Sequence, residues 1–149
     1  MLLSRRELTA ALVAPLVAPV AYWIGLTTFG LARVLTRPDQ YGHLPSLRQI
    51  LWPLGFILTV GAPIAWATAA VAGLPAYLVV RGDATAAVAL GTGRRAALLA
   101  VGALLGAVVA QLMKPQLKGE LFSIPFPPWA GALLGLAVAA TFLWMVARG

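Results

Sequence analysis

The feature that most constrains this chain is an apolar run, residues 96–113, that contains no charged side chain. About 20 apolar residues are needed for a helix to cross a bilayer, and this run reaches the short end of the range. Further apolar runs lie at about 8–35, 53–80 and 128–146. We therefore predict an all-α integral membrane protein in which four transmembrane helices form one bundle, as a single domain over residues 1–149.

Composition supports this prediction, because the chain has too few charged side chains to cover a water-soluble globule. Charged residues make up 10% of the sequence, against about 25% in typical soluble domains. The mean hydropathy is +0.91. Cysteine is absent from the sequence, which excludes disulfide bonds and thiolate metal sites.

Prolines interrupt the first two runs. Pro15 and Pro19 lie early in the first, and Pro53, Pro63 and Pro75 divide the second. Proline lacks the amide donor and clashes with the preceding helical turn. We therefore expect the second span to be tilted and kinked, and the regular part of the first span to be kinked or confined to its later half.

Small residues recur at every fourth position in the last three runs. The sequence GALLGAVVA at 102–110 is nearly repeated as GALLGLAVA at 131–139. In lipid, small residues let helix backbones approach closely, and this packing replaces the hydrophobic force that lipid tails do not supply. Either the third and fourth spans pack against each other, or one groove faces outward and docks another membrane protein. The predicted helix-packing residues are Gly61, Ala65, Ala69, Gly73, Gly102, Gly106, Ala110, Gly131, Gly135 and Ala139.

The net charge of +7 comes from basic side chains that fall in the gaps between apolar runs. This distribution favours contact with lipid headgroups over nucleic-acid binding. With four spans, the side that holds both termini carries six basic residues against five on the other. We predict a bacterial inner-membrane protein with both termini in the cytoplasm. The predicted headgroup-contacting residues are Arg5, Arg6, Arg94, Arg95, Lys114 and Lys118.

The four acidic residues are expected in four different connections. They are Glu7, Asp39, Asp83 and Glu120, and none lies inside a predicted span. A charged side chain within the membrane is the usual mark of a proton relay or an ion-coupled carrier. The sequence therefore argues against a transporter of that kind.

His43, Asp39 and Ser46 include the residue types of a hydrolytic triad, but they lie close together in one loop. Known triads draw their members from separated elements. We interpret these residues as turn and cap residues, with Ser46 capping a helix that begins at Leu47. A single histidine cannot hold a metal ion alone. We predict no catalytic residues, no cofactor and no metal site.

Polar side chains within the spans have two interpretations. A threonine hydroxyl can bond to the preceding turn of its own helix and then needs no partner. Alternatively, these side chains line a pore, and the Gln111 amide favours an interhelical partner or the interface. The polar residues concerned are Thr27, Thr28, Thr59, Thr68, Thr141 and Gln111.

The sequence GLPAYLVVR at 73–81, followed by a loop and two glycine-spaced spans, resembles small four-span bacterial inner-membrane proteins of unknown function. The resemblance covers about residues 60–147. It implies the four-span topology and no activity.

The functional expectation is a non-enzymatic polytopic membrane protein, an accessory or scaffold subunit that packs against another membrane protein. One alternative is a small homo-oligomeric channel or carrier for a neutral solute. Another is a lipid-handling protein. The expected partners are membrane lipids and another membrane protein or a second copy of this chain.

Overall fold

The computed structural model describes residues 3–37, 39, 45–82, 90–113 and 127–148. All regular elements among these residues are helices. Four helical stretches are long and apolar enough to cross a membrane: Arg5–Thr36, Leu47–Arg81, Thr92–Met113 and Pro128–Ala147. The prediction of an all-α chain with four helices of membrane-spanning length is therefore confirmed.

The first stretch consists of α1 (Arg5–Val13), a 3₁₀ turn η1 (Ala14–Leu16) and α2 (Val17–Thr36). It begins earlier than expected because Ser4 caps α1. The Ser4 hydroxyl accepts a hydrogen bond from the Glu7 amide, and the Glu7 carboxylate accepts one from the Ser4 amide. This reciprocal pair satisfies two amide groups at the start of the helix.

The second stretch consists of α4 (Leu47–Thr68), a π-helical turn η2 (Ala69–Gly73) and α5 (Leu74–Arg81). Ser46 caps α4, as the sequence predicts. Pro75 lies in the first turn of α5, where the missing amide hydrogen is tolerated. At Gly82 the backbone has a φ of 58° and α5 ends, because glycine adopts this left-handed conformation without steric cost.

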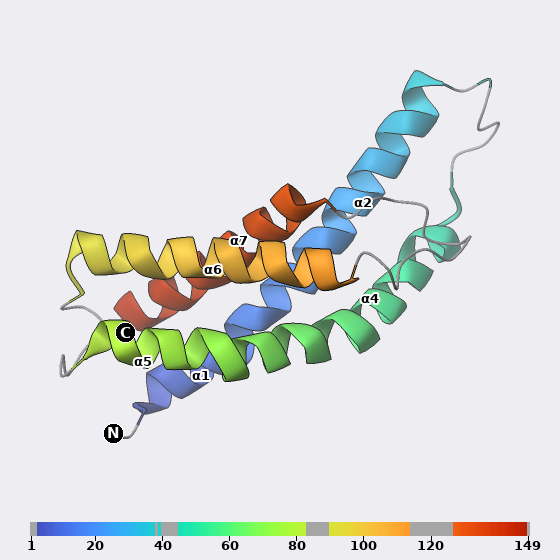
Figure 1. The fold of residues 1–149 in the computed structure, drawn as a ribbon. Helices are drawn as coiled ribbons and strands as arrows, with labels where there is room; N and C mark the ends of the chain where they lie inside the picture. Colours follow the sequence, from blue (N-terminus) through green and yellow to red (C-terminus); the bar gives the residue numbers. More distant parts are fainter. Residues whose placement is uncertain (1–2, 38, 40–44, 83–89, 114–126, 149) are drawn as a thin grey trace.

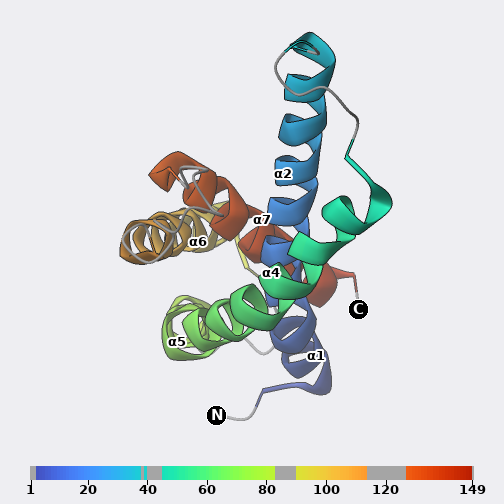
Figure 2. The ribbon, with the colours of Figure 1, turned by 90° about the vertical axis from the view of Figure 1, so that its right-hand side faces the viewer.

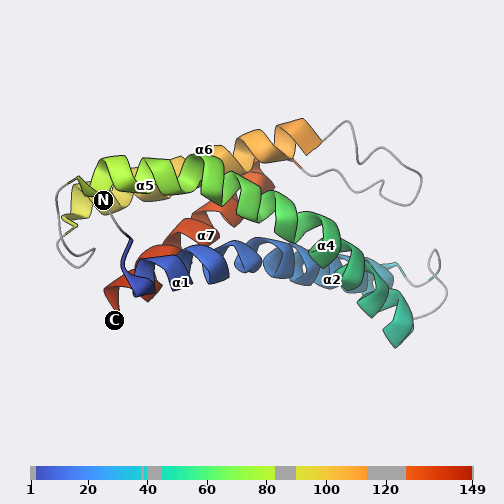
Figure 3. The same ribbon diagram turned by 90° about the horizontal axis from the view of Figure 1, so that it is seen from below.

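The last two stretches are single helices, α6 (Thr92–Met113) and α7 (Pro128–Ala147). The start of α1, the end of α5, the start of α6 and the end of α7 gather at one end of the molecule (Figure 1 and Figure 3). We call this the closed end. A buried apolar cluster lies here, and its members are Ala10, Tyr77, Leu90, Leu98 and Val146.

At the opposite end the helices spread apart. The last turns of α2 and the first turns of α4 extend past α6 and α7 (Figure 1), and the last turns of α2 stand apart from α6 and α7 in the perpendicular view (Figure 2). We call this the splayed end. The molecule is therefore well packed at one end and open at the other.

Some predicted features lie outside the described residues. They are His43, Asp83, Lys114, Lys118 and Glu120.

Candidate functional site

The glycine repeats of α6 and α7 lie face to face. A Cβ atom added to Gly102 would lie 2.6 Å from the Ala139 Cβ and 2.7 Å from the Gly135 carbonyl oxygen. A Cβ added to Gly106 would overlap the carbonyl oxygen of Gly131. Real Cβ atoms essentially never come under 3.0 Å from such neighbours. The two backbones therefore approach to a separation that only glycine allows.

The third small-residue stripe, on α4 and η2, has a different environment. A Cβ added to Gly61 would lie 3.4 Å from the Pro19 Cβ, and one added to Gly73 would meet nothing closer than 3.9 Å. These are ordinary van der Waals contact distances. Gly61, Ala65, Ala69 and Gly73 form part of the wall of a cavity between the helices, and the α6 and α7 glycines form another part.

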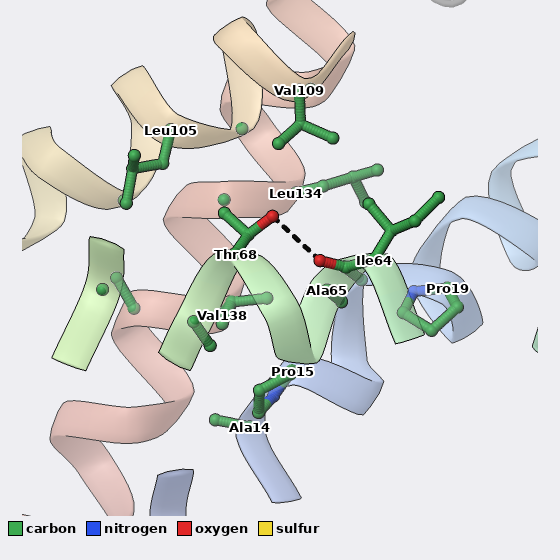
Figure 4. A pocket seen from close by; sticks show the side chains of 18 of the residues that line it. Ala14, Pro15, Pro19, Ile64, Ala65, Thr68, Leu105, Val109, Leu134 and Val138 are labelled. Atoms are coloured by element: carbon green, nitrogen blue, oxygen red, sulfur yellow. Dashed lines mark hydrogen bonds between the residues drawn. The ribbon is translucent and has the colours of Figure 1, made fainter. Parts of the chain in front are cut away.

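This cavity has a volume of about 420 Å³ and is lined by residues from every span. Figure 4 shows part of the wall: Leu105 and Val109 from α6 face Ile64 and Thr68 from α4, and Val138 from α7 lies beside them. The cavity exists because small side chains on the second span do not fill the space that α6 and α7 leave.

The cavity wall is almost entirely carbon. The residues with polar side chains in it are Tyr22, Thr68 and Tyr77. The Thr68 hydroxyl donates to the Ile64 carbonyl 2.8 Å away (dashed in Figure 4). The Tyr77 hydroxyl donates to a Glu7 carboxylate oxygen at 2.5 Å, behind the wall. The Thr68 and Tyr77 hydroxyls are therefore committed to acceptors within the protein.

Glu7 and Arg81 form a buried ion pair at the closed end. Arg81 Nη1 donates to Glu7 Oε1 at 2.8 Å. Arg81 is 8% exposed and Glu7 is 2% exposed. The pair joins the first turn of α1 to the last residue of α5. The expectation that Glu7 stands in a polar connection is therefore wrong: it lies in the third position of α1, buried against the second span.

Charges inside the apolar runs do not reveal this ion pair, because Glu7 directly precedes the first run and Arg81 directly follows the second. One signal was available for Glu7. Ser4-x-x-Glu7 before an apolar run has the pattern of a capping box, which predicts a helix beginning at Arg5. Nothing in the sequence indicates that the carboxylate then faces Arg81, since that depends on how two distant helices pack.

Two tryptophans also connect helices. Trp23 Nε1 donates to the Ile50 carbonyl at 3.0 Å and joins α2 to α4. Trp66 Nε1 donates to the Leu12 carbonyl at 2.8 Å and joins α4 to α1. Interhelical hydrogen bonds of this kind hold membrane helices in register. Sequence reasoning missed both.

The in-span threonines do not form a polar track. Thr59, Thr68 and Thr141 each donate to the carbonyl four residues earlier in their own helix. This is the local bonding that lets threonine stand in an apolar helix without a partner. Gln111 is exposed in the last turn of α6, Thr28 is exposed on α2 and Thr27 is partly buried there.

The described basic residues of the predicted headgroup set lie at the closed end. Arg5 and Arg6 are exposed in the first turn of α1. Arg94 donates to the Arg81 carbonyl at 3.4 Å, and Arg95 to the Leu90 carbonyl at 3.0 Å. The Arg94 bond joins the start of α6 to the last residue of α5, while the Arg95 bond is local, to a residue just before α6.

Comparisons with protein families, with curated proteins and with solved structures found no match to this chain.

Proposed function

We propose that this chain is a non-enzymatic integral membrane protein, an accessory subunit that binds another membrane protein through the splayed ends of α2 and α4. The observation that carries the proposal is the length of the first two helical stretches. They contain 32 and 35 residues, or about 48 and 52 Å at 1.5 Å per residue, against a hydrocarbon core of about 30 Å. By the same measure α6 and α7, with 22 and 20 residues, match the core.

Tilting cannot absorb this excess. Fitting about 48 Å into about 30 Å requires a tilt of roughly 50°, beyond the usual range of about 0–40°. With the basic closed end at one membrane face, the last turn of α2 and the first two turns of α4 project beyond the core. Large apolar side chains are exposed there, namely Leu35, Leu47, Leu51 and Trp52. Apolar side chains outside the hydrocarbon are stabilised by a protein partner.

We expect a photo-crosslinking amino acid at Leu35 or Leu51 to give a discrete heteromeric adduct in native membranes. The matched control is Val79, which is 81% exposed but stands on α5 near the closed end. Adducts are separated by electrophoresis and identified by mass spectrometry. Equal adducts at all three positions, or lipid adducts alone, would count against the accessory-subunit proposal.

We further propose that the protein stands in a bacterial cytoplasmic membrane with both termini inside. Support comes from the closed end, where the start of α1, the end of α7 and the start of α6 lie together (Figure 1). The start of α6 carries Arg94 and Arg95. Basic residues close to span ends favour the cytoplasmic side.

The sequence contains no cysteine, so single cysteines report topology without background. In intact cells we expect a membrane-impermeant maleimide to label Arg48→Cys at the splayed end. Arg148→Cys should react only after permeabilisation. The reverse labelling pattern would show that the termini face outward.

A further inference from the structure

We propose that the cavity in the bundle is a binding site for one acyl chain of a membrane lipid. This inference concerns the interior of the fold and does not depend on a protein partner.

The cavity is long. Along α6 its lining extends from Leu98 to Met113, which is about 22 Å at 1.5 Å per residue. Its volume of about 420 Å³ falls in the range of about 300–1,000 Å³ found for small-molecule sites. An extended hydrocarbon chain is a ligand of matching length.

The wall selects for hydrocarbon. The hydroxyls of Thr68 and Tyr77 already donate to acceptors within the protein. A polar solute that entered this space would lose hydrogen bonds to water without replacement. A hydrocarbon chain has no hydrogen bonds to lose, and it gains dispersion contacts with side chains such as Leu105, Val109 and Val138 (Figure 4).

The two ends of the cavity differ. At the closed end, Tyr77 and Phe142 line it and pack edge to face with centroids 4.9 Å apart. The buried cluster and the Glu7–Arg81 pair lie at this same end of the bundle. Toward the splayed end the lining includes Phe56, which lies in the first half of α4. A chain enters from the splayed end and stops against the Tyr77–Phe142 pair.

The test uses the purified full-length protein in vesicles of phosphatidylcholine that carries a diazirine at the end of one acyl chain. After illumination, labelled residues are mapped by mass spectrometry. We expect label on inward-facing residues, with Leu105 and Val138 as the markers. Label confined to outward-facing positions such as Leu104, which is 65% exposed, would overturn the proposal.

A cavity-filling variant provides the second arm. Ala65→Phe places a ring in the cavity and should reduce label on Leu105 and Val138 by about tenfold, since overfilling a packed site excludes its occupant. Val71→Phe is the matched control, because Val71 is 79% exposed on the neighbouring η2 turn. Unchanged inward label in Ala65→Phe would contradict the proposal. If Ala65→Phe does not fold, judged by helicity and elution volume, the wild-type labelling map decides alone.

Discussion

Replacing Glu7 with alanine is expected to destabilise the fold by about 3–5 kcal/mol, because it leaves the buried Arg81 guanidinium without its counter-charge. Arg81 is 8% exposed, and its Nη1 lies 2.8 Å from Glu7 Oε1. The Glu7 carboxylate also accepts hydrogen bonds from the Tyr77 hydroxyl and from the Ser4 amide, the second of which is part of the capping box of α1. A single substitution therefore removes a charge pair, the hydrogen bond from Tyr77 and the carboxylate half of the capping box, while the Ser4 hydroxyl still caps the helix.

The measurement is the free energy of unfolding in mixed micelles titrated with a denaturing detergent. Arg6→Ala is the matched control, since it removes an exposed charge from the same helical turn. We expect that change to lie within about 0.5 kcal/mol of wild type. If Glu7→Ala costs no more than Arg6→Ala, the ion pair does not hold the closed end together.

A double-variant cycle separates the energy of the Glu7–Arg81 interaction from the energies of the other contacts that each residue makes. The combination of Glu7→Ala and Arg81→Ala should cost clearly less than the two single changes added, because neither buried charge is then left alone. Full additivity would mean that each residue acts through other contacts. A residual cost in the double variant is expected because the Ser4 amide and the Tyr77 hydroxyl lose the carboxylate that accepts their hydrogen bonds.

The four membrane-length helices were predictable because each depends on composition over some 20 residues, and no distant contact can reverse that preference. The starts of the first two stretches depend on single residues. Ser46 was predicted to cap a helix that begins at Leu47, as it does, whereas the cap at Ser4, which moves the start of the first stretch to Arg5, was not predicted. Caps are decided by one or two side chains, and the averaged hydropathy of a run does not register them.

The candidate site depends on packing between distant segments, and so most of it could not be read from the sequence. The spacing of the small residues identified three stripes, and contact between the third and fourth spans was one of the two alternatives that it left open. Two of them meet at the α6–α7 contact, while the stripe that includes Gly61 and Gly73 lines a cavity. The Glu7–Arg81 pair is harder still to predict from the sequence, because the two residues are 74 positions apart and meet only through the packing of two helices.

Adding one methyl group at Gly106 should separate α6 from α7. Gly106→Ala is expected to cost about 1–3 kcal/mol, because the new Cβ overlaps the Gly131 carbonyl oxygen and neither backbone can yield without moving its helix. The intrinsic preference acts in the opposite direction, since alanine favours a helix over glycine by about 0.5–1 kcal/mol. The steric term is expected to win because the overlap is with backbone and not with a flexible side chain.

Gly55→Ala is the matched control for this change. Gly55 lies inside α4, and a Cβ added there meets no atom within 4 Å. Only the helix preference then acts, and we expect stabilisation by up to about 1 kcal/mol. The two substitutions are chemically identical, and the packing of their sites predicts opposite signs in the same unfolding titration. Stabilisation by Gly106→Ala as well would show that the close approach of α6 and α7 does not exist in the membrane.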